Sequence, residues 1–280
     1  MTDDSPRRAC LTLDLEKNWN FEDPELKYAT FDYLDDYIDL LDTLDLPLSV
    51  FVVGETIEDR PDAIERLQER LDVEFHLHSY SHDISGSADF EREVRLGTQA
   101  FESFFGRQPE GYRSTQGRIE RSAFRFLESS GFLFDSSVFP TYRPGVYNNL
   151  RAPVEPYQAT GTDSLLEIPV AVVPRLRFPL SQGYVKAIGA PFLAVLRHIP
   201  LQDVVVYNSH LQDFYHTQAH ERLGPQRKLF YGRNVAQSEH IFERVVETLR
   251  RKGYSFVKMT DVYDAYTEGG DRPRRRSAND

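Results

Sequence analysis

The chain has 280 residues, of which 40% are hydrophobic, and its 44 acidic against 33 basic side chains give a formal net charge of −11. This charge argues against a nucleic acid or an anionic membrane as the partner, because such partners attract basic proteins. A chain of this length can bury one large core, and α/β barrels of this size form single domains. No linker interrupts it, so we expect one domain over residues 9–266 with flexible termini at 1–8 and 267–280.

The compartment is inferred from signals that the sequence lacks. No apolar run reaches the ~18 residues of a membrane span, and no basic-then-apolar leader begins the chain, so the expected location is the cytoplasm. Cys10 is the single cysteine, which excludes an internal disulfide, and its place before a strand pattern predicts burial. Lysine is scarce, with 6 against 27 arginines. This composition suits either a protein of concentrated salt or an ordinary acidic protein.

Strand and helix patterns alternate along the chain. Strand patterns fall at residues 11–16, 48–53, 73–78, 111–113, 132–135, 165–173, 204–207 and 254–257. Helical patterns fall at residues 26–44, 61–71, 91–105, 123–129 and 239–251. This alternation predicts parallel strands that are joined by right-handed crossovers, an α/β fold.

Side chains capable of chemistry occur where the predicted strands end. They are Asp14, His78, Arg113, Asp135 and His210. In α/β barrels, active sites assemble at these strand ends. Residues 140–163 are rich in Pro, Gly, Asn and Tyr without periodicity, and we expect this long loop to form part of a substrate wall.

The strongest local signal is a pair of histidines, His78 and His82, at the end of the third predicted strand. Two imidazoles and one carboxylate commonly hold a divalent metal ion and leave open positions for water and substrate, and the acids Asp14 and Glu16 are candidates for the carboxylate. Asp14 and Glu16 are two apart on a strand and therefore share a face. His76 shares the strand face of His78, but we interpret it as a packed strand histidine rather than a further ligand.

These residues, with others in the same order, resemble the polysaccharide deacetylases of carbohydrate esterase family four, the NodB homology domain. The matching segments are residues 12–16, 49–54, 74–82, 111–113, 131–137, 165–169, 183–184 and 206–210. The resemblance implies a distorted (β/α)7 barrel, an N-acetylated carbohydrate as substrate and a divalent metal ion as cofactor. Zinc suits the expected ligands, and other divalent ions suit them too.

The resemblance also implies a role for each matched residue. The implied metal ligands are Glu16, His78 and His82. The implied catalytic residues are Asp14 as general base, Arg113 beside it, His210 as general acid, and Asp135 or Glu167 as the carboxylate that keeps His210 protonated. Tyr112, Gln116 and Trp19 are expected at the substrate. Two alternatives remain open: Glu16 could point into solvent, and Trp19 could serve packing.

The chain departs from the commoner family pattern at three places. Leu15 separates the two acids that are usually adjacent, and Thr115 stands where a proline is usual. Leu211-Gln212-Asp213 follows His210 where a Pro-Trp pair is often found. We therefore expect the loop after Arg113, with its backbone oxyanion donor near Gln116, and one side of the sugar pocket to differ in shape.

Three functions compete. The leading one is hydrolysis of the acetamide of N-acetylated sugars, of the N-acetylglucosamine type, in an oligosaccharide, a polysaccharide or a glycan precursor. The second is hydrolysis of a small amide or cyclic ureide, as in the allantoinase-like branch, but some of those proteins lack the metal histidines that are present here as His78 and His82. The third is a catalytically silent carbohydrate-binding relative, a class that tends to lose residues equivalent to Asp14 or His210.

Overall fold

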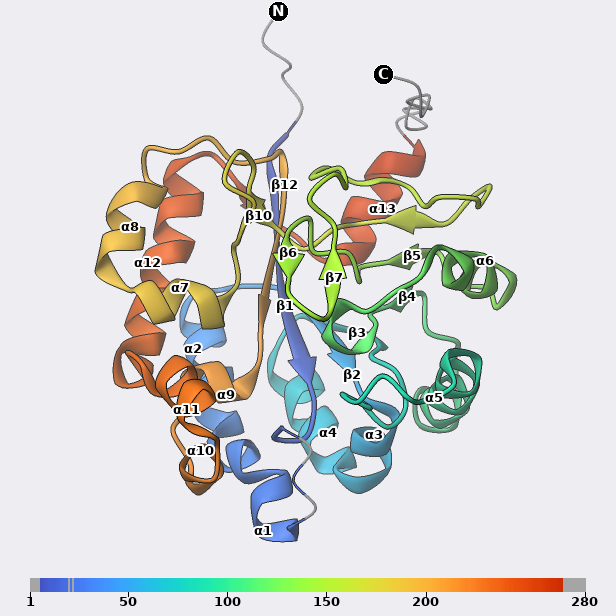
Figure 1. Ribbon diagram of the computed structural model, residues 1–280, viewed down its shortest axis with the longest axis horizontal. Coiled ribbons are helices and arrows are strands. Elements are labelled where there is room, and N and C mark those ends of the chain that lie inside the picture. The colour runs from blue at the N-terminus through green and yellow to red at the C-terminus, as the bar shows by residue number, and fades with distance from the viewer. Residues whose placement is uncertain (1–5, 20, 22, 269–280) are drawn as a thin grey trace, which may run out of the picture.

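A central sheet of mostly parallel strands organises the computed structural model, which describes residues 6–19, 21 and 23–268 (Figure 1). The order of the hydrogen-bonded strands is β12-β1-β2-β3-β4-β5-β9-β8. All neighbouring pairs in this order are parallel except β8 with β9, and the short β13 also pairs with β1 in parallel. The bounds are β1 Arg8–Leu15, β2 Leu48–Val52, β3 Val73–Leu77, β4 Gly111–Tyr112, β5 Phe134–Asp135, β8 Tyr157–Gln158, β9 Leu166–Glu167, β12 Val204–Ser209 and β13 Ser255–Phe256.

The sheet forms an incomplete barrel, as predicted. Seven parallel strands run from β12 to β9 in the described part of the chain, and no regular ladder joins these two ends. The gap is bridged by the Ala171 N–H, which donates to the Val206 carbonyl over 2.9 Å, and by a parallel bridge between Ser181 and Asn208. The structure is a single-domain distorted (β/α)7 barrel. Most of the residues predicted to be flexible termini lie outside the described residues.

Helices surround the sheet. Their bounds are α1 Pro24–Lys27, α2 Leu34–Thr43, α3 Gly54–Asp59, α4 Pro61–Arg70, α5 Phe90–Phe105, α6 Arg121–Ser129, α7 Gln182–Ile188, α8 Ala190–Leu196, α9 Leu211–Phe214, α10 Gln218–Glu221, α11 Pro225–Gly232, α12 Ser238–Arg251 and α13 Met259–Glu268. Three 3₁₀ turns, η1 Ala29–Tyr33, η2 Thr115–Gly117 and η3 Val235–Gln237, complete the described set. Within the described range, no helix combines the length and the apolar character that crossing a membrane requires.

Two expected elements are divided in the structure. The helix predicted over residues 26–44 is α1, η1 and α2, because the backbone N–H and the hydroxyl of Thr30 both donate to Asn18 and interrupt the helical pattern. The strand predicted over residues 165–173 is β9 followed by β10, Val172–Val173, which pairs with β11, Phe178–Pro179. Pro169 lies between them and has no N–H for a ladder, and there the chain crosses from β5 toward β12.

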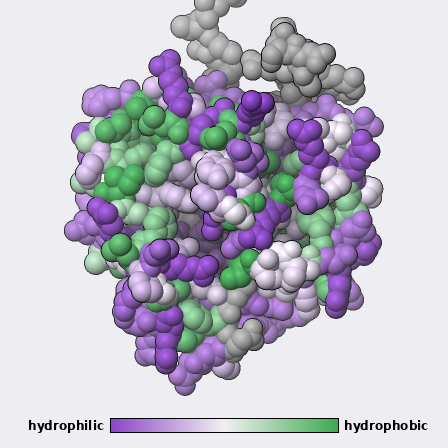
Figure 2. All heavy atoms as spheres, in the orientation of Figure 1, coloured by the Kyte–Doolittle hydropathy of each residue, from purple (hydrophilic) through white to green (hydrophobic). Residues whose placement is uncertain are grey.

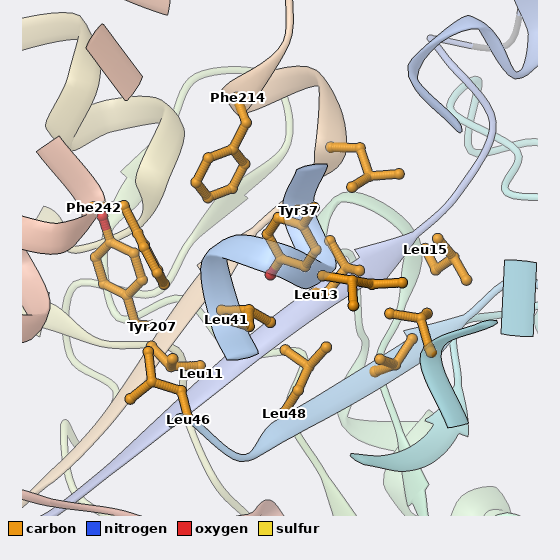
Figure 3. Close-up of a cluster of buried hydrophobic side chains, with 14 of the residues drawn as sticks. Leu11, Leu13, Leu15, Tyr37, Leu41, Leu46, Leu48, Tyr207, Phe214 and Phe242 are labelled. Carbon is orange, nitrogen blue, oxygen red and sulfur yellow. The ribbon is translucent and has the colours of Figure 1, made fainter. Parts of the chain in front are cut away.

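The alternation along β1 decides which side chains enter the barrel. Leu11, Leu13 and Leu15 are buried against the outer helices, packed with Tyr37 of α2 and Phe242 of α12 among others (Figure 3). Burial of each such leucine contributes roughly 1.5–3 kcal/mol. The even-numbered residues of β1 must then point to the opposite face. Asp14 therefore projects into the barrel, next to the carboxyl ends of the parallel strands.

The lower interior of the barrel is apolar. Cys10, Phe51, Phe134 and Val206 belong to one buried cluster, and burial raises the pKa of the Cys10 thiol well above its usual value. His76 lies between the rings of Phe51 and Phe134, at centroid distances of 5.2 and 4.9 Å. These neighbours make His76 part of the core, as we expected.

The loop over residues 140–163 is partly ordered into strands. Residues Tyr142–Arg143 (β6) and Tyr147–Asn148 (β7) form a short antiparallel hairpin that lies in front of the sheet in Figure 1. Figure 2 shows hydrophilic residues over most of the same face, in keeping with the net charge, and hydrophobic ones around α8 and α12 at the upper left.

Candidate metal centre and active site

Glu16, His78 and His82 form a buried cluster at the carboxyl ends of β1 and β3. One ligand atom from each residue lies within 4.8 Å of the others. Glu16 Oε2 is 2.5 Å from His82 Nε2 and 3.6 Å from His78 Nε2. Two imidazole nitrogens and a carboxylate oxygen that converge in this way fit the donor set of a divalent metal ion.

The orientation of His78 leaves one ring nitrogen available to a metal. His78 Nδ1 lies 2.8 Å from the Arg113 carbonyl oxygen. Because a carbonyl oxygen only accepts, Nδ1 carries the proton and Nε2 presents its lone pair toward Glu16. The backbone carbonyl thereby fixes both the tautomer and the ring orientation.

The turn after β3 brings His82 back beside His78. Ser79 and His82 both have positive φ, 58° and 55°, and these left-handed residues bend the chain so that the two imidazole rings lie 5.1 Å apart. Glu93 of α5 holds the turn, because it accepts from the N–H groups of Tyr80 and Ser81 over 3.1 and 2.8 Å. The left-handed positions are therefore supported by a specific side chain from a neighbouring helix.

Asp14 lies next to this cluster and is nearly fully buried. Its Oδ1 accepts from Arg113 over 2.5 Å, and its Oδ2 accepts from the Asn208 side chain over 2.9 Å. Burial acts to raise the pKa of Asp14, but the charges of Arg113 and of the nearby histidines outweigh it and lower this pKa below its usual value. The carboxyl group is therefore ionised and held in one orientation at neutral pH.

Arg113 is fixed from several sides. Its Nε donates to the Ser136 carbonyl over 3.0 Å, a second nitrogen donates to the Ser136 hydroxyl over 3.0 Å, and a third donates to Thr12 over 3.0 Å. The guanidinium carbon lies 3.9 Å from the centre of the Phe51 ring. A fully buried arginine with these partners has little freedom to move away from Asp14.

His210 stands at the end of β12 with a carboxylate that we did not predict for it. Asp213 accepts from the His210 backbone N–H and lies 3.1 Å from Nδ1, so Asp213 rather than Asp135 or Glu167 is its partner. Burial alone would lower the pKa of His210, but the carboxylates of Glu16, Asp213 and Asp14 raise it to about 10. The prediction that Asp135 or Glu167 keeps His210 protonated is wrong, because Asp213, three residues after His210, contacts the imidazole ring instead.

Asp135 and Glu167 are placed behind Arg113, where they interact with each other. Asp135 accepts from the Ser137 N–H and hydroxyl over 3.0 and 2.7 Å, and Glu167 accepts from the Val138 N–H over 3.0 Å. Burial, reinforced by the adjacent Asp135, raises the pKa of Glu167 well above its usual range. The pair thus fixes residues 136–138, the segment whose Ser136 holds Arg113.

Two further polar side chains reach the acids from the end of the barrel. Gln212 of α9 donates to Glu16 Oε1 over 2.8 Å, and Asn208 of β12 donates to Asp14. Sequence reasoning assigned neither role. The acids that Asn208 and Gln212 bind are distant in sequence. The local sequence pattern therefore gave no sign of these contacts beyond the position of both residues near His210.

The predicted substrate residues do not share one location. Trp19 and Gln116 line a cavity of about 350 Å³ together with the residues described above. Gln116 has a φ of 57° in the loop that departs from the family pattern. Tyr112 is fully buried and its hydroxyl lies 3.0 Å from the Ser79 hydroxyl, so it lines only the neighbouring cavity of about 580 Å³.

A family model described as "Polysaccharide deacetylase" matches residues 21–134, a segment that contains both cluster histidines and Arg113. Over this segment, the chain is similar to polysaccharide deacetylases. This similarity supports a hydrolase that acts on amide bonds and implies an N-acetylated carbohydrate as its substrate. A search of curated proteins found no match.

Solved structures share the fold at low sequence identity. A putative polysaccharide deacetylase from Mycobacterium smegmatis is 17% identical, with a TM-score of 0.63 over 96% of this chain and 93% of that one. A Puue allantoinase is 15% identical, with a TM-score of 0.61 over 94% and 91%. A CE4 family pseudoenzyme from Bacillus anthracis is 9% identical, with a TM-score of 0.54 over 93% and 66%. The fold alone therefore does not distinguish a deacetylase from an allantoinase or an inactive relative.

Proposed function

We propose that this protein is a metal-dependent N-deacetylase that hydrolyses the acetamide group of N-acetylated sugars, of the N-acetylglucosamine type. One observation carries the proposal: the Glu16, His78 and His82 cluster opens into the same cavity as the Asp14–Arg113 pair and His210. A metal site, a candidate general base and a candidate general acid together are what hydrolysis of an unactivated amide requires.

The ligands for the ion are Glu16, His78 and His82. Bound there, a divalent ion would polarise the acetamide carbonyl and lower the pKa of water, and zinc is the ion we expect. Gln212 keeps the Glu16 carboxylate oriented through its hydrogen bond to Oε1, which leaves Oε2 directed at the histidines.

Asp14 accepts a proton from the attacking water. Arg113 keeps its carboxylate ionised, and Asn208 directs the second oxygen toward the cluster, where it lies 3.9 Å from His78 Nε2. Such a base contributes on the order of 10²–10⁴-fold to the rate.

A backbone N–H completes the support for the developing oxyanion. The Ser114 N–H is already bonded to the Ser137 hydroxyl over 2.8 Å. Gln116 lines the cavity, and within the described structure its N–H has no acceptor. We assign the oxyanion contact to the Gln116 N–H.

His210 protonates the departing amine. An amide nitrogen leaves only when it receives a proton, because a free amide anion is too basic to expel. The three surrounding carboxylates raise the pKa of His210 to about 10, so the ring holds that proton at neutral pH. Its Nε2 lies 3.5 Å from Asp14 Oδ2, so acid and base face the same point.

The first experiment measures acetate released from N-acetylglucosamine oligomers by purified protein, with added zinc and with a chelator. We expect release that the chelator abolishes and that falls by about 10²–10⁴-fold in Asp14→Asn, while the metal content is retained. A panel of small amides and cyclic ureides is tested in parallel. Release of product only from that panel, or none from any compound by a fully metal-loaded sample, would overturn the sugar N-deacetylase proposal.

A further inference from the structure

The mouth of the catalytic cavity contains two arginines that the chemistry above does not use. Arg143 lies on β6 and Arg227 on α11, two elements from separate parts of the chain (Figure 1). Both residues line the same cavity. Among the described residues, neither takes part in an ion pair, whereas Arg113 on the cavity floor is paired with Asp14. In a chain with more acidic than basic side chains, unpaired arginines at a cavity need an explanation.

The acids that line the same cavity are already engaged on its floor. They are Asp14, Glu16 and Asp213. Asp14 is bonded to Arg113, Asp213 to His210, and Glu16 to Gln212 and the cluster histidines. Among the described residues, the cavity wall therefore supplies no free carboxylate for Arg143 or Arg227. An anionic group on a bound molecule would supply a counter-charge.

Arg143 lies close to two tyrosines of the cavity wall, Tyr147 and Tyr231. Tyr147 of β7 stacks on Phe139 at 6.2 Å, and burial raises the pKa of Tyr147 to about 12 against the opposing effect of the neighbouring Arg143. The charge of Arg143 also opposes the rise in the pKa of the partly buried Tyr231 of α11, the helix that carries Arg227. The side chain of Arg143 thus lies on the side of the β6–β7 hairpin that faces α11. A substrate bound at the metal site would extend outward past this position.

We propose that the N-acetylated substrate carries an anionic group, a carboxylate or a phosphate, and that Arg143 and Arg227 bind it at the cavity mouth. This inference rests on the proposed deacetylase function, because it is the acetamide on the floor that orients the anion toward the arginines. Guanidinium groups bind carboxylate and phosphate with charge-assisted hydrogen bonds, which are about twice as strong as neutral ones. A purely neutral sugar would leave both charges unmatched.

The test compares three probes of similar acetamide chemistry. They are neutral N-acetylglucosamine oligomers, oligomers in which N-acetylglucosamine alternates with glucuronic acid, and N-acetylglucosamine 6-phosphate. We measure kcat/KM for acetate release and, independently of turnover, the Kd by calorimetry. We expect at least one acidic probe to exceed the neutral one by about tenfold in both quantities, and the advantage to shrink as salt is raised. The responding arm identifies the anion as carboxylate or phosphate.

The variants Arg143→Gln and Arg227→Gln sharpen the test. Each should reduce the ratio of acidic to neutral probe in kcat/KM and Kd by about fivefold to tenfold, since each removes one charged donor. Arg197→Gln, on the exposed end of α8 and outside the cavity, is the matched control and should leave the ratio unchanged.

The two proposals fail in different ways. Acetate release without any preference for the acidic probes, or a preference that both variants retain, overturns the anionic-substrate inference and leaves the deacetylase function standing. Tighter binding of an acidic probe without acetate release from any sugar overturns the function and supports the anion site. Equal binding of all three probes overturns the inference in either case.

Discussion

Two histidines, His76 on β3 and His78 one residue beyond its end, have different surroundings. His78, at the strand end, opens onto a cavity where it meets Glu16, His82 and Asp14. His76, two residues earlier, lies between Phe51 and Phe134 and contacts Glu74 Oε1 over 3.0 Å. The two side chains are of the same type and two residues apart, so the difference comes from the neighbouring segments.

The surroundings explain this difference. At the upper position, Glu16 Oε2 faces the Nε2 atoms of His78 and His82, an arrangement that a divalent cation would complete. At the lower position, Glu74 is satisfied by Ser49, by the N–H of Met259 and by the Thr260 hydroxyl, and aromatic rings close the space. One histidine–carboxylate pair is thus suited to a ligand, and the other ties β3 to the start of α13.

The largest expected effect is loss of metal, which should distinguish His78 from His76. His78→Gln should lower metal affinity by at least about 100-fold, since it removes an assigned ligand, and acetate release should fall with it. His76→Gln is the matched variant two residues earlier and should retain close to one metal ion per chain. Metal content by mass spectrometry of the purified proteins gives the comparison. Equal metal loss in both variants would show that the two histidines do not differ as described.

The next largest effect is a change in the pH dependence of catalysis, and it tests the pair of His210 and Asp213. Asp213→Asn removes a charge that raises the pKa of His210, so this pKa should fall. Because His210 must be protonated to donate, the fall of kcat/KM on the basic side of the pH profile should move to lower pH. We expect kcat/KM at pH 8 to drop by about tenfold or more.

Asparagine at position 213 can still accept the His210 N–H, so the fold should be retained. Asp36→Asn, on the exposed face of α2, serves as the control and should leave the pH profile unchanged. An unshifted basic limb in Asp213→Asn would exclude His210 as the acid that Asp213 positions.

The sequence predicts the positions of Asp14, Glu16, His78 and His82 better than it predicts the residues that surround them. Strand alternation placed Asp14 and Glu16 on one face, and a strand-to-turn location let His78 and His82 converge, so these positions follow from local geometry. The partner of His210 does not follow in this way. Asp213 reaches the ring through a turn at which the chain departs from the family pattern, whereas the predicted Asp135 and Glu167 are drawn together behind Arg113.

The two short helices after β12 could not be predicted from the sequence either. The helices α9 and α10 have four residues each, too few to show a period of 3.6, yet Gln212 of α9 reaches Glu16. Likewise the predicted helix over residues 26–44 was interrupted by Asn18, a residue that lies outside the helical pattern. Contacts from distant segments decided both cases, and such contacts leave little trace in local periodicity.

The smallest effect on activity is expected at the lower position. Glu74→Gln should leave acetate release unchanged at pH 7 but lower the free energy of unfolding. Burial opposes ionisation of Glu74, yet hydrogen bonds from His76, Ser49 and Thr260 lower its pKa from 4.5 to about 2. A shift of this size corresponds to at most about 3 kcal/mol.

The sign of its pH dependence follows from the depressed pKa. The stabilisation is present above the unfolded pKa of 4.5 and is lost as pH falls through about 2. Urea unfolding of wild-type and Glu74→Gln protein in steps from pH 7 to pH 3 should therefore show the largest difference at pH 7, with the curves converging toward the acid end. Glu69→Gln, exposed on α4, should show no such convergence. If Glu74→Gln instead lost metal at pH 7 while its stability was unchanged, the lower pair would belong to the metal site, and the contrast between His76 and His78 would be wrong.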